Sequence, residues 1–152
     1  MTSRENKQIK EAELKATEQI IKEMNIDGVI DNLLSLPANI CSQEKVLAMF
    51  KRKLDDAKSE LDLAKQVIVA VVISETNEDG KPRYTNEKAR EAEIAKRMNV
   101  GSEYQKVLKK VREAEEEVNS EQFEMNCLLN EFSAYRAVAK ILAGKLQLMA
   151  GL

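Results

Sequence analysis

The chain has 152 residues, of which 24 are basic and 26 acidic, and it contains no His and no Trp. That length suits a single domain, and 33% charged with only 4% aromatic residues is typical of long helices rather than of an aromatic-rich core. The lack of His removes the commonest general base and metal ligand, and two Cys alone cannot form a four-ligand zinc site. We therefore expect no enzyme, no cofactor and no metal site.

The N-terminal residues, the longest apolar run and the two cysteines indicate the cellular compartment in which we expect the protein. Residues 1–10 carry three basic side chains and no apolar stretch, so we expect neither a signal peptide nor a membrane anchor there. The most apolar run, residues 67–73, is far shorter than the roughly 20 residues of a membrane span. Cys41 and Cys127 stand in patterns where a small apolar side chain would serve, so we interpret them as packing residues in a reducing cytoplasm.

Residues 1–40 are expected to form a helical segment separate from the rest of the chain. Apolar residues lie roughly on one face between residues 3 and 24, which predicts a helix that frays at its start. A second short element, residues 28–36, is too apolar to be a free linker. Pro37 is expected to end it, because proline removes a backbone donor and disfavours a helix interior.

A coiled-coil helix is predicted over residues 43–74, with Ser42 as its N-cap. Apolar residues then alternate at steps of three and four, which fills every a and d position of four heptads. These positions form the first heptad seam: Leu47, Phe50, Leu54, Ala57, Leu61, Ala64, Ile68 and Val71. Residues 67–73 are also β-branched and apolar on all sides, so a buried strand competes there, but the unbroken register favours a helix.

The chain is expected to reverse over residues 75–84, where Asp79-Gly80 is a turn signal. Thr85 is the predicted cap of the next helix, which Asn99-Val100-Gly101 interrupts, and Ser102 with Gln105 predicts a capping box at a second start. The steps of three and four then resume as the second heptad seam, in which only Glu121 is polar: Tyr104, Val107, Val111, Ala114, Val118, Glu121, Met125, Leu128, Phe132, Tyr135, Ala139, Leu142, Leu146 and Met149.

These elements predict an all-α fold. It is a long antiparallel helical hairpin of residues 43–74 and 86–149, kinked near Gly101, with two shorter N-terminal helices; the domain boundary falls between residues 40 and 41. A two-helix hairpin buries little apolar surface by itself, so we expect a homo-oligomer that shares the heptad seam.

Charge is distributed unevenly along the second half of the chain. Residues 81–112 hold ten basic and four acidic side chains, while residues 113–131 hold seven Glu and no base. Ordinary solvated coiled-coil faces explain such blocks, and so would a protein partner. The third interpretation is a nucleic-acid site, because a tyrosine among cations is one component of single-strand stacking sites. Its candidate residues are Lys81, Arg83, Tyr84, Lys88, Arg90 and Arg97.

The glutamate cluster that includes Glu113 and Glu121 could suggest a carboxylate metal site. Di-iron bundles, however, need Glu-x-x-His pairs that project inward from facing helices, and the chain has no His. We interpret the cluster as a solvated face or an acidic interaction stripe. Glu121 in the seam is then a register-fixing polar residue rather than a catalytic acid.

Several segments resemble a family of small coiled-coil proteins of bacteriophages and prophages. The resemblance lies in the Gly-Lys-Pro turn with Tyr84, Asn86-Glu87 and Arg90, in the acidic stretch 112–117, and in an Asn-x-Phe-x-x-x-Arg signature at residues 130–136. It covers roughly residues 45–142. It implies a role near DNA replication or recombination genes, in the host cytoplasm, and it assigns no functional residue.

The sequence thus favours a non-enzymatic accessory or mediator protein that acts through charged helical surfaces. Its expected partners are itself and single-stranded DNA or a phage or host DNA-processing protein, with no membrane involved. The alternative is a protein-binding inhibitor of a host nuclease or defence complex.

Overall fold

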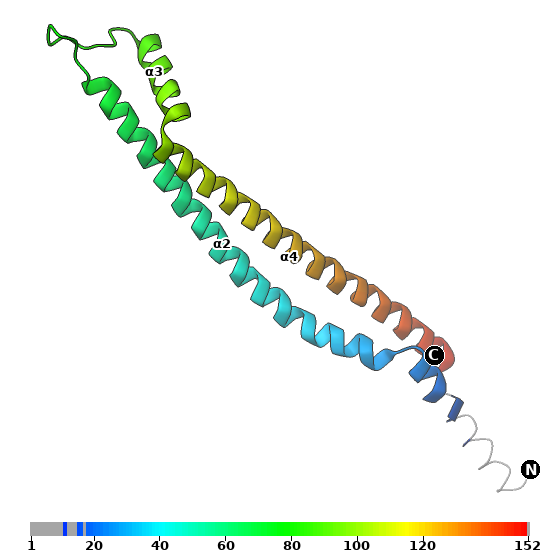
Figure 1. The fold of residues 1–152 in the computed structure, drawn as a ribbon. Coiled ribbons are helices and arrows are strands. Elements are labelled where there is room, and N and C mark those ends of the chain that lie inside the picture. The colour runs from blue at the N-terminus through cyan, green and yellow to red at the C-terminus, as the bar shows by residue number, and fades with distance from the viewer. Residues whose placement is uncertain (1–10, 12–14, 17, 152) are drawn as a thin grey trace, which may run out of the picture. The chain divides into compact units, whose positions relative to one another are not determined.

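A computed structural model describes residues 11, 15–16 and 18–151, and these are all-α, as predicted (Figure 1). Residues 18–23 are helical and precede α2 (Ile26–Ser74), α3 (Glu87–Val100) and α4 (Ser102–Met149). The helix expected over residues 3–24 lies partly outside the described residues. The segment 1–10, on which the expected lack of a signal peptide rests, lies wholly outside them. No helix in the described part is both long and apolar enough to cross a membrane.

Helix α2 runs without interruption through Pro37, so the predicted break and the predicted cap at Ser42 are wrong. The apolar element 28–36 is therefore the start of α2 and not a separate short helix. Val29, Leu36 and Leu47 are all buried on this one helix, on both sides of the proline. Pro37 itself is exposed, so its ring requires no space in the core, and burial of the flanking side chains offsets the lost backbone hydrogen bond.

The described chain forms two compact units. One combines the residues up to Gln43 with those from Met125 onward, and the other comprises residues 44–124. In the first unit, Val29, Leu36 and Met125 are buried. Both cysteines also belong to this unit, as exposed free thiols, so the prediction that they are packing residues is wrong.

In the unit of residues 44–124, α2 and α4 pack antiparallel. The ion pairs between them show the direction, because early residues of α2 contact late residues of α4. Lys53 pairs with Glu117 at 4.0 Å, and Lys58 pairs with Glu115 at 3.5 Å. Lys110 pairs with Glu60 at 2.9 Å. The buried core of this unit is apolar: Leu47, Val72, Val107, Val111 and Ala114.

The predicted heptad seams are turned inward except at their last positions, Val71 in α2 and Met149 in α4, which are both exposed. Positions from Leu47 to Ile68 are buried or half-buried, but Val71 is 44% exposed while its neighbour Val72 is only 1% exposed. Helix α4 begins at Ser102, and beyond that level α3 takes its place beside α2 (Figure 1). A change of partner rotates the buried face by one residue, which the heptad register does not anticipate.

Helices α3 and α4 begin close to the predicted residues, but their predicted capping interactions are not the ones that form. Asn86, not Thr85, caps α3, with its Oδ1 accepting a hydrogen bond from the Ala89 amide at 2.7 Å. The capping box at Ser102 is wrong as well, because Ser102 already lies inside α4. The Gln105 side chain instead donates to the Met98 carbonyl at 2.7 Å, which ties the start of α4 to the end of α3.

Candidate functional site

The turn that joins α2 to α3 is a short, well-defined hairpin. Thr76 and Pro82 form an antiparallel bridge, and the Arg83 amide donates to the Glu75 carbonyl at 2.9 Å. The Asn77 side chain organises the tip, because its Oδ1 accepts from the amides of Asp79 at 3.2 Å and Lys81 at 2.9 Å. Gly80 has a φ of 74°, which glycine adopts readily. The predicted Asp79-Gly80 turn is confirmed, and it fixes the backbone of Lys81.

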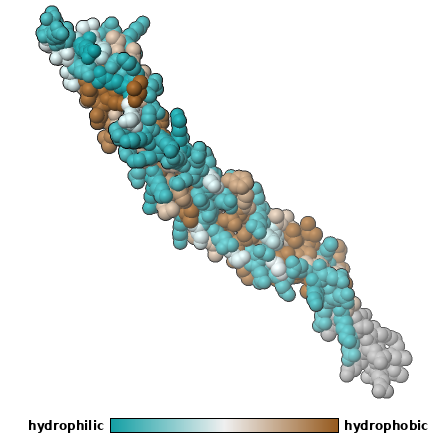
Figure 2. Space-filling view, in the orientation of Figure 1, coloured by the Kyte–Doolittle hydropathy of each residue, from teal (hydrophilic) through white to brown (hydrophobic). Residues whose placement is uncertain are grey.

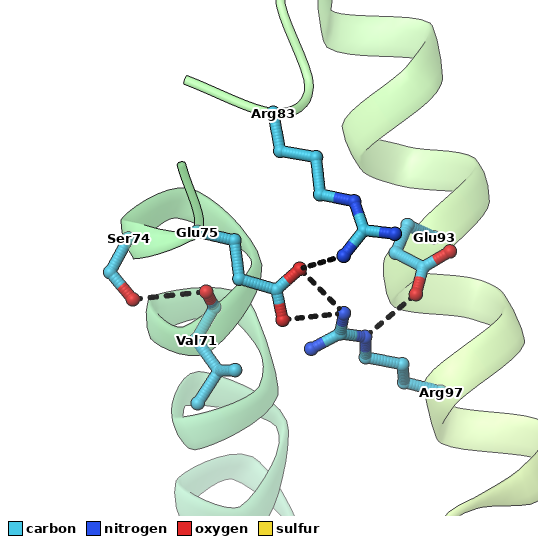
Figure 3. A network of polar contacts seen from close by, with 6 residues as sticks. All are labelled: Val71, Ser74, Glu75, Arg83, Glu93 and Arg97. Atoms are coloured by element: carbon cyan, nitrogen blue, oxygen red, sulfur yellow. Dashed lines mark hydrogen bonds and ion pairs between the residues drawn. The ribbon is translucent and has the colours of Figure 1, made fainter. Parts of the chain in front are cut away.

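A polar cluster joins the start of this turn to α3 (Figure 3). The Arg97 guanidinium donates to both oxygens of Glu75, at 2.7 and 2.9 Å, and its Nε donates to Glu93 at 2.8 Å. Arg83 approaches the same Glu75 carboxylate at 3.6 Å. Arg97 thus holds two carboxylates from different elements, and we call Glu75, Arg83, Glu93 and Arg97 the Glu75 cluster.

The electrostatics of the Glu75 cluster match its geometry. The hydrogen bond from Arg97 holds the pKa of Glu93 below its ordinary value. The hydrogen bonds to Glu93 and then Glu75 raise the pKa of Arg97. A hydrogen bond with Tyr84 is a smaller cause of both shifts, since it lowers the pKa of Glu93 and raises the pKa of Arg97. Glu93 and Arg97 therefore stabilise each other in their ionised forms.

The six residues predicted as a nucleic-acid site fall into two groups. The structure brings Arg83, Tyr84 and Arg97 together around Glu75, and the Arg83 guanidinium lies over the Tyr84 ring at 5.7 Å. Lys81 and Lys88 are exposed and form no ion pair with any described residue. Arg90 is half-buried, and its Nε has no hydrogen-bond partner among the described residues.

Sequence reasoning missed the two carboxylates of the Glu75 cluster. Glu93 and Arg97 are four residues apart on one helix, a spacing at which an ion pair is expected, so that contact could have been predicted. The contact of Glu75 with Arg97 spans 22 residues and depends on how the turn folds. No sequence signal indicates it.

An apolar groove lies where the junction of α3 and α4 meets α2. It has a volume of about 560 Å³, and its apolar lining includes Ala64, Val67, Ile68, Val100 and Tyr104. Gly101 belongs to the same wall and separates the two helices in an extended conformation, with its amide donating to the Arg97 carbonyl at 2.7 Å. The groove contains few polar groups that could orient a small molecule or carry out a reaction.

Comparison with known proteins adds no relative, because no family model, curated protein or solved structure matches the chain. Within the described residues, no group of three or more Cys, Asp or Glu side chains is arranged to hold a metal ion. The function is therefore inferred from the turn, the Glu75 cluster and the surfaces around them.

Proposed function

We propose that the protein is a non-enzymatic accessory or mediator protein that binds single-stranded DNA through the basic turn, next to the replication or recombination machinery of a phage in its host's cytoplasm. The observation that carries this proposal is the pair of unpaired, exposed cations Lys81 and Lys88 on either side of Arg83 and Tyr84. Exposed cations neutralise phosphates and release counterions, which supplies most sequence-independent affinity for nucleic acid.

Ion pairs within the chain neutralise half of the basic block, and Lys96 and Arg112 are exposed without an ion pair to a described residue, as Lys81 and Lys88 are. Five of the ten basic residues in 81–112 pair with acids of the same chain: Arg83, Arg97, Lys106, Lys109 and Lys110. Arg97 holds two carboxylates and is largely neutralised, so we assign it a positioning role for the turn rather than a contact with DNA. Lys81 and Lys88 form no ion pair with a described residue, and the Asn77 side chain holds the backbone amide of Lys81.

Tyr84 has a limited capacity for stacking. Its side chain is half-buried, and Arg83 covers one face of the ring. A base could therefore stack only on the other face, which agrees with a site in which phosphate contacts dominate over base contacts.

The test is the salt dependence of binding to a fluorescent single-stranded oligonucleotide. We expect Lys81→Gln with Lys88→Gln to lower the slope of log affinity against log salt by about 1.4, because each phosphate contact on a single strand releases about 0.7 counterion. The matched control is Lys106→Gln with Lys110→Gln, which removes the same charge from residues already paired with Glu103 and Glu60. That control should leave the slope close to wild type.

Equal slopes for both double variants would show that binding follows net charge and not this turn. If the wild type does not bind single strands even at low salt, the proposal is wrong. The alternative function, an inhibitor that occludes a host nuclease or defence complex, then becomes the better explanation of the same charged surfaces.

A further inference from the structure

The last turns of α2 carry exposed apolar residues on the side opposite Val72, and one of them, Val67, also lines the apolar groove. Leu63 and Val67 are 62% and 63% exposed, although Val72, on the opposite side of the helix, is only 1% exposed. Ala70 and Ser74 continue the exposed side. We call Leu63, Val67, Ala70 and Ser74 the outer face. Figure 2 shows hydrophobic atoms gathered over this end of α2, next to the hydrophilic turn.

The outer face has the spacing of a coiled-coil seam. Its residues follow one another at steps of four, three and four, the same alternation as in the seam that packs on α4. One heptad earlier the equivalent positions are the charged Asp56 and Glu60, so the apolar stretch begins sharply at Leu63. The residues that flank it, Gln66, Val71 and Ile73, are uncharged.

Ser74 does not prevent burial of this face. Its hydroxyl donates to the Val71 carbonyl at 3.0 Å within the same helix, so the donor stays satisfied when water is excluded (Figure 3). The outer face can therefore pack against another helix without leaving an unpaired charge or an unpaired hydroxyl donor.

We propose that the outer face binds the outer face of a second copy of this chain, in the antiparallel direction about a two-fold axis. Side-chain size is ordered along the outer face, because the two large residues come first and the two small ones last. Antiparallel pairing sets Leu63 opposite Ser74 and Val67 opposite Ala70, so each large side chain meets a small one. Parallel pairing would set like against like and leave space between the small residues.

The lack of charged residues on α2 beside the outer face also favours a second copy of this chain as its partner. A partner helix with an ordinary coiled-coil pattern carries charged residues beside its seam, and the residues of α2 that flank the outer face offer them no counterion. A second copy brings the same uncharged flanks. The contact is isologous, as in most closed dimers, and it leaves the α2–α4 seam of each chain intact.

Sedimentation equilibrium under reducing conditions tests the assembly. We expect the mass to approach twice 17.2 kDa in the micromolar range. Val67→Asp should raise the dissociation constant on the order of a hundredfold or more, because each copy would bury an unpaired carboxylate. The matched control is Phe123→Asp, which places the same charge at a 66% exposed residue of α4 and should leave the dissociation constant unchanged. Circular dichroism should show equal helicity in all three proteins.

Disulfide trapping tests the direction, in a background with Cys41→Ser and Cys127→Ser. Leu63→Cys protein mixed with Ser74→Cys protein should form a mixed disulfide. Leu63→Cys protein alone should not cross-link, because antiparallel pairing separates the two copies of that residue by about 16 Å along the axis. A monomer, a dimer unaffected by Val67→Asp, or a homodisulfide of Leu63→Cys would each overturn the proposal.

Discussion

Arg97 and Glu75 lie 22 residues apart in the chain, and their 2.7 Å ion pair joins α3 to the end of α2. This contact matters because none of the residues of α3 is fully buried. A helix of 14 residues without a fully buried side chain is marginal by itself in water, so contacts with its neighbours decide whether it stays in place. The Glu75 cluster therefore fixes α3 and, with it, one wall of the apolar groove.

Replacement of Arg97 should loosen α3 without unfolding the unit of residues 44–124. In Arg97→Met we expect faster amide hydrogen exchange along α3, because Glu75 and Glu93 lose their shared partner, while α2 and α4 keep their protection. The control is Lys96→Met, at an exposed neighbouring position that forms no ion pair with a described residue. Unchanged exchange in α3 would show that packing alone holds this helix.

Acid should release α3 through Glu93. Its pKa in the folded protein is lowered below the ordinary value of 4.5, mainly by the hydrogen bond from Arg97. A carboxyl group with a depressed pKa stabilises the fold above its unfolded pKa, and this contribution is lost as the pH falls through the folded pKa. We therefore expect protection of α3, corrected for intrinsic exchange rates, to decrease as the pH falls below 4.5.

Glu93→Gln should reduce the pH dependence of α3 protection, because the variant has no carboxyl group to titrate at this position. Glu103 is the matched comparison, since its pKa is also lowered, mainly by the hydrogen bond from Lys106 within α4. Glu103→Gln should leave the pH dependence of α3 as in the wild type. An equal effect of both substitutions would mean that Glu93 has no special role.

The sequence predicts the helices well where a single partner covers a helix along its length. From Leu47 to Ile68 the steps of three and four identify the inward face, because the spacing alone determines which side chains share a side of a helix. The prediction fails at Val71, where α3 replaces α4 beside α2. That change of partner depends on the length of the turn and on the residue at which α4 begins. The spacing of apolar residues in α2 gives no information about either.

The candidate site was predictable in part, for a similar reason. The turn follows from Asp79-Gly80, but the choice between Thr85 and Asn86 as cap depends on one residue of register. The charge block of residues 81–112 is evident from the sequence, whereas its division into paired and unpaired cations is not. Lys110 pairs with Glu60, 50 residues away, only because α2 and α4 are antiparallel.

Pro37 provides a prediction on stability. Because α2 continues through this residue, the proline deprives the helix of one backbone hydrogen bond. Pro37→Ala should restore it and raise the free energy of unfolding, by at most about 3 kcal/mol, the difference between the two residues in a helix interior. Urea denaturation followed by circular dichroism measures the change. A loss of stability would mean that the native helix has adapted to the proline.

Gly101 provides the sharpest steric prediction. Its φ of −68° and ψ of 109° are open to any residue, so the backbone conformation does not require glycine. A Cβ at this position, however, would lie 2.6 Å from the Arg97 carbonyl oxygen, which is backbone and cannot rotate away. Gly101→Ala should therefore displace the junction between α3 and α4 and lower the free energy of unfolding by about 1 to 3 kcal/mol, as overpacking typically does.

The chain contains its own control for Gly101→Ala. Gly144 lies inside α4, and a Cβ there would meet nothing within 4 Å. Gly144→Ala should raise the free energy of unfolding by roughly 0.5 to 1 kcal/mol, because alanine loses less backbone entropy than glycine in a helix. The two substitutions add the same methyl group and should have opposite signs in urea denaturation. If both stabilise, the close approach of the Arg97 carbonyl to Gly101 does not constrain the junction. If both destabilise, Gly144 lies against a surface outside the described contacts, and the loss at Gly101 can no longer be assigned to that carbonyl alone.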